Sequence, residues 1–227
     1  DALNYDPESD GCENGSNDCC DYYVPPTPLT IYEIQGQADA TPYVDVFVST
    51  SGVVTGVTPN GFWLQDGAGA WNGIWVYAPE LTLAIGDNVT AVGTVIEYYD
   101  LTEIMLDEVT VNSSGNILPY SEEVCTGCFT EALESVLVVA MGECDNNDLG
   151  YGEWSIDDGS GPGMVDDKMY APDTIYAGHM YAVVGPLDYA YGNFKIQPRD
   201  GNDVMNLSLP GPDFSVSLDA TASAGTY

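Results

Sequence analysis

Short runs rich in Val, Ile, Thr, Tyr and Trp recur along most of the chain, and Gly, Asn, Asp and Pro separate them. This composition, with turn residues between the runs, predicts β-strands rather than helices. In the first half of the chain we expect five strands, at residues 46–57, 62–66, 73–77, 88–99 and 101–111. The second half has a similar series, at residues 135–144, 153–157, 163–170, 179–189 and 193–198.

The two series of strands are copies of one plan. A constant offset of 92 residues pairs Asp66 with Asp158, Gly67 with Gly159, Gly86 with Gly178, Gly93 with Gly185, Tyr99 with Tyr191 and Ile104 with Ile196. Glycines that recur at turns, with β-rich runs between them, indicate a repeated supersecondary unit.

Each copy has the strand number of a small barrel. Five short strands in roughly 90 residues, with glycines where the first long strand can coil, are typical of the OB fold. A pair of immunoglobulin-like sandwiches is the alternative, but it requires about seven strands in each unit. We therefore predict an all-β protein of two tandem five-stranded OB-like barrels with an extension at each end. The expected boundaries are an N-terminal Cys-containing arm at 1–28, barrels at 29–118 and 119–206, and a C-terminal extended strand at 207–227.

Two motif-rich stretches are similar to known modules. The stretch "SGVVTGVTPNGFWLQDGAGAWNGIWVY" resembles the OB-fold modules of secreted bacterial proteins, which often precede the catalytic domain of extracellular nucleases. The stretch "YAVVGPLDYAYGNFKIQPRDGNDV" is similar to a sister module of secreted, surface-sorted proteins. The resemblance covers roughly residues 30–206. It implies a fold and export, but no reaction, because the sequence lacks the nuclease domain.

The charge narrows the possible partners. The chain has 36 acidic and 3 basic residues, a net charge of -33. Such a surface repels phosphate backbones, so we expect no direct binding to nucleic acid or anionic membranes. No apolar run approaches the roughly 18 residues of a membrane span. The charge instead suits high salt or divalent cations.

We predict at least one structural Ca²⁺ ion, because Ca²⁺ takes carboxylate, amide and carbonyl oxygens from loops. Segment 10–21 partly follows the EF-hand pattern, and two further acidic loops are alternatives. The candidate ligands are Asp10, Asn14 and Asp21 in that segment, Asp145, Asn147 and Asp148 in the second, and Asp166 and Asp167 in the third. The competing interpretation is a solvated acidic surface.

Six cysteines and a start at Asp1 are typical of an exported, disulfide-containing chain. The candidates are Cys12, Cys19, Cys20, Cys125, Cys128 and Cys144. We expect at least one bond between the arm and the second half. Zinc binding at the CxxC pair and six buried thiols are the alternatives.

An aromatic face is predicted on the first barrel. Side chains alternate along strands, so Phe62, Leu64, Ile74 and Val76 point inward. The same alternation places Trp63, Trp75 and Tyr77 outside, on the face where OB barrels bind ligands. The matching face of the second half carries acids. A neutral glycan or a protein surface is the expected partner, and packing by the arm or by the other barrel is the alternative.

The sequence contains no recognisable catalytic motif. His179 is the sole histidine, and adjacent acids are expected in so acidic a chain. In the tail, Phe214, Val216, Leu218 and Ala220 alternate with polar residues, as in a half-buried strand. We predict a non-enzymatic, secreted structural or adhesive surface protein. Its subunits would form a homopolymer by donor-strand-like addition of this tail, stabilised by Ca²⁺ and disulfides. A glycan- or nucleic-acid-binding accessory module is the alternative, and the tail would otherwise fold back on its own module.

Overall fold

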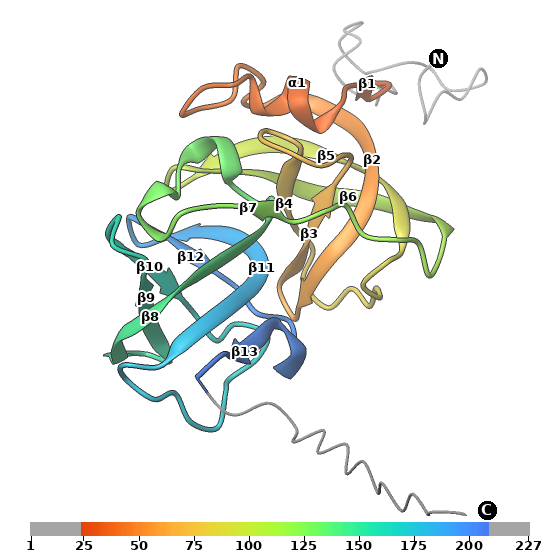
Figure 1. Ribbon diagram of the computed structural model, residues 1–227. Coiled ribbons are helices and arrows are strands. Elements are labelled where there is room, and N and C mark those ends of the chain that lie inside the picture. Colours follow the sequence, from red (N-terminus) through yellow and green to blue (C-terminus); the bar gives the residue numbers. More distant parts are fainter. Residues whose placement is uncertain (1–23, 209–227) are drawn as a thin grey trace, which may run out of the picture.

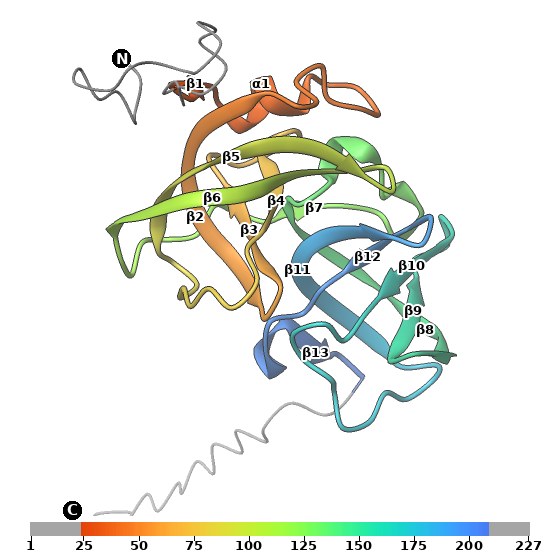
Figure 2. The same ribbon diagram turned by 180° about the vertical axis from the view of Figure 1, so that it is seen from behind.

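The computed structural model describes residues 24–208 of the 227-residue chain. The described part is all-β, with one sheet in each half of the chain and the two sheets side by side (Figures 1 and 2). The predicted arm and C-terminal strand lie almost wholly outside the described residues.

The first sheet contains a closed five-stranded barrel. Its pairings run β2-β3-β4-β6-β5 and return from β5 to β2, so the ring has no free edge. A two-residue strand, β1, adds to β2 in parallel. The strands are β1 (Thr27–Pro28), β2 (Phe47–Thr58), β3 (Gly61–Gln65), β4 (Gly73–Tyr77), β5 (Asn88–Tyr98) and β6 (Leu101–Ser113).

The barrel interior follows from the alternation of apolar residues. Phe62, Leu64, Ile74 and Val76 are at most 1% exposed, so the predicted inward set is confirmed. Glycine allows the long strands to pass close to their neighbours. A Cβ on Gly93 would lie 2.2 Å from the carbonyl oxygen of Met105.

The second sheet repeats this order of pairing. It runs β8-β9-β10-β12-β11, with an additional β11–β8 pairing, and β7 and β13 lie at its edges. The β8–β9 pairing shifts register twice within three residue pairs, so this join is irregular. The strands are β7 (Glu122–Glu123), β8 (Leu137–Gly150), β9 (Glu153–Asp157), β10 (Pro162–Val165), β11 (Met180–Ala190), β12 (Asn193–Ile196) and β13 (Val204–Asn206).

Equivalent residues of the two repeats have equivalent roles. Gly185 would bring a Cβ within 2.2 Å of the Gln197 carbonyl oxygen, as Gly93 does at Met105. Tyr99 and Tyr191 have left-handed φ values of 51° and 54° in the matching hairpin turns. The 92-residue offset is therefore a structural repeat.

Each repeat also uses its aligned aspartate to cap a short helix. The Asp66 carboxylate accepts a hydrogen bond of 2.9 Å from the backbone N–H of Ile31, where α1 (Ile31–Gln35) begins. Asp158 accepts one of 3.2 Å from Thr126, where the 3₁₀ helix η1 (Thr126–Cys128) begins. These caps fix each helix against the hairpin of its own sheet.

Three local predictions need correction. The strand expected at 163–170 ends at Val165, because the following acids turn towards other partners. Strand β8 extends to Gly150, into the loop expected at 145–152. Helix α1 was not expected, although Thr30 and Glu33 form a capping box at its start.

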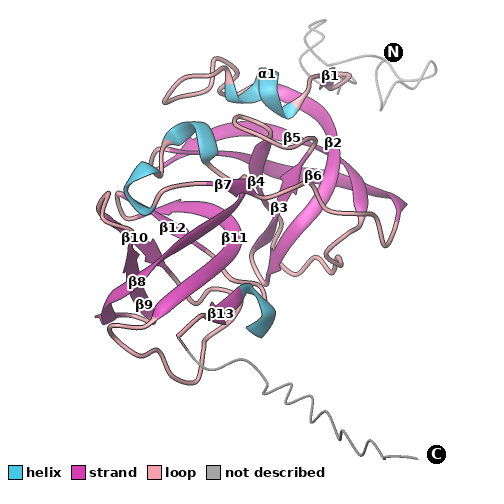
Figure 3. Ribbon diagram, in the orientation of Figure 1, coloured by secondary structure: helices cyan, strands magenta, loops and turns pink. Residues whose placement is uncertain are grey.

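The remaining helical segments are two short 3₁₀ turns, η2 (Glu131–Leu133) and η3 (Gly201–Asp203) (Figure 3). Among residues 24–208, no helix has the length and apolar character needed to cross a membrane.

Candidate functional site

The aromatic face predicted on the first barrel lies in the junction between the two sheets. Trp63 is fully buried and Trp75 is 9% exposed, with their ring centroids 4.5 Å apart. Met169 and Tyr189 of the second half pack against this aromatic cluster. Of the three predicted aromatic residues, only Tyr77 is exposed, at 40%. The second half of the chain therefore covers Trp63 and Trp75, which was the alternative to an exposed ligand-binding face.

Hydrogen bonds of backbone and side-chain amide groups connect the two halves at the junction. The backbone N–H of Leu137 donates to Oε1 of Gln65 at 3.0 Å, and Gln65 is fully buried. The backbone N–H of Trp71 donates to the carbonyl oxygen of Ala132 at 2.7 Å. Gly73 has no room for a side chain, because a Cβ would lie 2.3 Å from the backbone of Ser135. The halves therefore meet through specific hydrogen bonds as well as apolar contact.

A buried acidic cluster lies at one side of this junction. Glu134, which follows η2, is 1% exposed and accepts a hydrogen bond of 3.3 Å from the backbone N–H of Thr102 on β6. The amide nitrogen of Gln35 lies 3.5 Å from the same carboxylate oxygen. Burial raises the pKa of Glu134 well above its usual range, and the neighbouring Glu131 raises it further.

Glu131 is also a carboxyl group whose pKa is raised by burial. Burial raises its pKa to about 7, and the charges of Asp39 and Glu97 act in the same direction. This cluster was not predicted from the sequence. The sequence feature that could have indicated this cluster is a pair of glutamates, three residues apart, immediately before the apolar run that becomes β8.

A third buried glutamate lies near the aromatic residues. Glu103 on β6 is the parallel partner of Trp75 and is 5% exposed. Burial raises its pKa to about 7.

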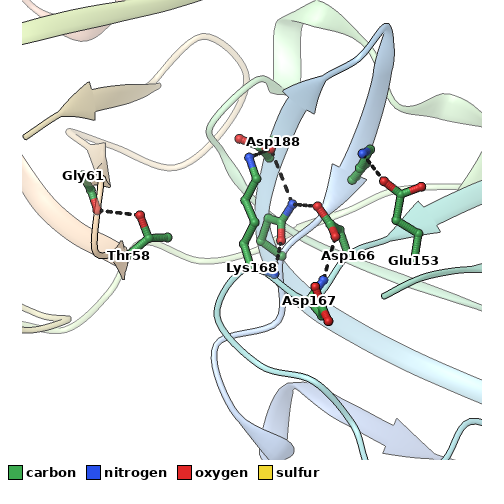
Figure 4. Close-up of polar contacts among 9 residues, drawn as sticks. Thr58, Gly61, Glu153, Asp166, Asp167, Lys168 and Asp188 are labelled. Atoms are coloured by element: carbon green, nitrogen blue, oxygen red, sulfur yellow. Dashed lines mark hydrogen bonds and ion pairs between the residues drawn. The ribbon is translucent and has the colours of Figure 1, made fainter. Parts of the chain in front are cut away.

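Within the predicted Asp166–Asp167 calcium pair, the Asp166 carboxylate accepts hydrogen bonds from other protein groups (Figure 4). Asp166 accepts hydrogen bonds from the side-chain amide of Gln197 at 3.0 Å and from the backbone N–H of Asp167 at 2.9 Å. The same Gln197 amide lies 3.5 Å from Asp188, which is paired with Lys168. Burial raises the pKa of Asp188 and the charge of Lys168 opposes this effect. Asp166 thus belongs to a buried polar network.

The acidic side chains and the amide predicted at 145–148 form hydrogen bonds within the protein. Asp145 accepts from the Ser155 hydroxyl at 2.7 Å, and Asp148 accepts from the backbone N–H of Gly150 at 2.9 Å. The Asn147 amide donates to the carbonyl oxygen of Ile175 at 3.1 Å. Within residues 24–208, no group of three or more His, Cys, Asp or Glu side chains is arranged to hold a metal ion.

The cysteines of the second half have separate environments. Cys125 and Cys128 form a disulfide with a Cα–Cα distance of 5.1 Å. Cys144 is a free, buried thiol in the core, and its pKa is raised by burial. Several predicted residues lie outside the described residues: Cys12, Cys19, Cys20, Asp10, Asn14, Asp21, Phe214, Val216, Leu218 and Ala220.

All basic side chains of the chain are paired within the second half. Lys168 pairs with Asp188 and Lys195 pairs with Glu153. Arg199 forms a bidentate pair with Asp203, at 2.6 and 2.8 Å. Since the sequence has three Lys and Arg residues in all, each has an acidic partner.

No protein-family model matches the sequence, and no curated protein matches it either. Several solved structures show a distant likeness. A murine DNA-binding protein bound to double-stranded DNA has 10% identity and a TM-score of 0.35, over 74% of this chain and 99% of that chain. The p204 HINb domain has 10% identity and a TM-score of 0.28, over 62% and 76%. A third structure, described as "Structural mimicry for functional antagonism", has 12% identity and a TM-score of 0.33, over 71% and 92%. These values assign neither a family nor a ligand to this chain.

Proposed function

We propose that this protein is a non-enzymatic, extracellular structural or adhesive component that associates with further copies of itself. One observation carries the proposal: a methionine-rich apolar face is exposed on an otherwise highly acidic molecule. Exposed apolar patches mark interaction sites more often than scattered apolar residues do. The second sheet, proposed here to be a second OB-like barrel, provides this face.

The apolar face spans three neighbouring strands. Met141 on β8 and Met205 on β13 lie on either side of Ala182 on β11, in one row across the sheet. Met180 lies on the same face of β11, two residues before Ala182, and Leu207 follows β13. Each of the three methionines is 40–48% exposed and Leu207 is 51% exposed. Flexible methionine side chains suit a surface that must adapt to a partner.

The expected occupant is the tail of a second copy, residues 213–227. Its apolar positions alternate with polar ones from Phe214 to Ala220, which suits a strand with one buried face. Strand β13 pairs only with β11 among the described strands, so its other side offers backbone groups for strand addition. A head-to-tail contact of this kind builds an open filament unless it closes into a ring.

The closed ring of the first barrel restricts where such addition can occur. The edges among the described residues are short: β1 and β7 have two residues each, and β13 has three. We therefore expect side chains on the methionine-rich face to contribute more to the contact than the backbone ladder does.

Other observations bear on the catalytic, nucleic-acid-binding and extracellular aspects of the proposal. His179 stacks on Tyr176 and contacts Asn206. The chain's basic side chains are held in ion pairs, so we expect no direct binding to nucleic acid. The Cys125–Cys128 disulfide is compatible with an oxidising, extracellular location.

A glycan-binding role is the second candidate. Tyr151 and Tyr191 are 98% and 95% exposed in the β8–β9 and β11–β12 turns. Lys195 lies 5.5 Å from the centre of the Tyr191 ring. Exposed aromatic rings at hairpin turns can stack on a neutral sugar.

Deletion of residues 213–227 tests the self-association. Light scattering and electron microscopy of the intact chain should show oligomers or filaments that the deleted chain does not form. The double variant Met180→Ser/Met205→Ser should lose assembly in the same way. Met105→Ser, which changes a methionine of similar exposure on β6, is the matched control. An intact chain that stays monomeric at high concentration, with and without Ca²⁺, would refute the proposal.

A further inference from the structure

Unpartnered buried oxygens gather at the acidic cluster of the junction. Within the described residues, six buried side-chain nitrogen or oxygen atoms have no hydrogen-bond partner. Four belong to the cluster and its immediate neighbours, and all four are oxygens: Oε1 of Gln35, Oε1 of Glu131, Oε2 of Glu134 and Oγ of Ser135. A buried acceptor without a donor typically costs about 1 to 3 kcal/mol. The carboxyl groups of Glu131 and Glu134 lie within hydrogen-bonding reach of each other, so a proton or a cation is needed to satisfy their free oxygens.

The chain has no basic side chain to supply that charge. Its lysines and arginine are paired with Asp188, Glu153 and Asp203 in the second sheet. Further carboxylates increase the negative charge at the cluster. Asp39, Glu97 and Asp100 all act on Glu131 in the direction that disfavours its ionised form. The compensating charge must therefore come from solution.

We propose that Glu131 and Glu134 bind a divalent cation of the Ca²⁺ type, with Gln35 as a neutral oxygen ligand. Calcium takes six to eight oxygen ligands, including carboxylates, amides, hydroxyls and water. The unpartnered atoms of the cluster are all oxygens, and Gln35 and Glu134 are each 1% exposed with one oxygen unpartnered. Two carboxylates agree with the finding that no group of three metal-ligating side chains occurs in residues 24–208. Ser135 and water would complete the coordination.

The position of the cluster gives the ion a structural role. Gln35 belongs to α1 of the first half, and its amide also donates to the Gly73 carbonyl oxygen at 2.8 Å. Glu131 and Glu134 belong to the connection that leads into β8. Glu131 is only partly buried, so an ion can enter beside it. A bound cation would thus tie the first half to the start of the second, independently of the self-association proposed above.

Terbium luminescence tests the site directly, because Tb³⁺ takes the ligands that Ca²⁺ takes and is sensitised by a nearby indole. Trp71 is the expected sensitiser, because its backbone N–H donates to the carbonyl oxygen of Ala132, which lies between the two glutamates in the sequence. The wild-type chain should bind one more equivalent of Tb³⁺ than Glu131→Gln/Glu134→Gln does, and Ca²⁺ should displace it. The matched control is Asp107→Asn/Glu108→Gln, which removes two exposed charges on β6 and should keep that equivalent.

A single-residue variant and calcium-dependent melting temperatures distinguish loss of the cation site from loss of folding. Glu131→Gln alone changes only the partly buried ligand and should weaken binding at least tenfold in a chain that folds normally, as judged by circular dichroism. Calcium titrations at constant ionic strength should raise the melting temperature of the wild type more than that of this variant. Equal Tb³⁺ stoichiometry in all variants would overturn the proposal. So would a wild type stabilised by acid but not by Ca²⁺, because a shared proton would then satisfy the pair.

Discussion

Gln65 and Leu137 join the two halves of the protein through one buried hydrogen bond. Oε1 of Gln65, at the end of β3, accepts from the backbone N–H of Leu137, the first residue of β8, at 3.0 Å. The Gln65 amide also donates to the carbonyl oxygen of Gly67 at 2.7 Å. One side chain thus satisfies a backbone donor of the second half and an acceptor of its own hairpin.

Gln65→Ala should therefore destabilise the protein by about 1 to 3 kcal/mol, because it leaves the buried Leu137 N–H without an acceptor. Urea denaturation followed by tryptophan fluorescence measures the change. Asn202→Ala, at an exposed position of η3, is the control and should change the free energy of unfolding by less than about 0.5 kcal/mol. Equal effects from both substitutions would show that the bond to Leu137 contributes nothing.

Trp63→Ala should cost about 3 to 5 kcal/mol, because Trp63 is fully buried in the junction and its loss leaves a large cavity there. Tyr77→Ala, on the neighbouring strand at 40% exposure, should cost no more than about 1 kcal/mol. Calorimetry of the same variant also shows whether the two halves unfold together or separately. If the junction couples the halves, the Trp63 variant should unfold in two transitions where the wild type shows one. A mild effect of Trp63→Ala would contradict its placement in the junction.

Gly93→Ala and Gly185→Ala should both be severely destabilising, by more than about 2 kcal/mol each. The added Cβ would meet a carbonyl oxygen at 2.2 Å in each repeat, and backbone cannot move aside as a side chain can. Gly67→Ala is the matched control, because its nearest neighbour would lie 3.7 Å away. Melting temperatures of the three variants measure the difference. A tolerated alanine at one of the two equivalent positions would show that the repeats close differently.

The buried glutamates should make the protein more stable in mild acid than at alkaline pH. The pKa of Glu103 is about 7 when folded against 4.5 for the free side chain, so the folded state binds more protons between these values. Its free energy of unfolding should therefore fall as the pH rises from about 4.5 to 7. Glu103→Gln should stabilise the protein at pH 8 by on the order of 1 to 3 kcal/mol and have little effect at pH 4.

Urea denaturation across this pH range, in the presence of a chelator, measures the effect of Glu103. Glu108→Gln, on the same strand but exposed, should leave the pH profile unchanged. Glu131 and Glu134 contribute in the same direction without a cation, so the profile of Glu103→Gln should retain part of the slope. A flat wild-type profile would contradict the burial of all three carboxyl groups.

The sequence by itself determined the strands, the repeat and the barrel interior. Alternation along a strand and glycine at turns are local properties, so Phe62 and Leu64 could be placed inside without knowledge of the rest of the chain. The offset between Gly93 and Gly185 likewise follows from the printed sequence alone. The predicted strand bounds were wrong where contacts with distant segments determine the structure. For example, β10 ends at Val165, and the next residue, Asp166, accepts a hydrogen bond from Gln197.

Only the tertiary structure decided what the outward faces do. Whether Trp63 meets solvent or the other half depends on how two sheets dock, and no residue pattern within one strand encodes that arrangement. The same holds for Glu131 and Glu134, which became a candidate cation site because Gln35, about 100 residues earlier in the sequence, lies beside them. Burial converts an ordinary surface carboxylate into a group that requires a partner, and burial is a property of the whole fold.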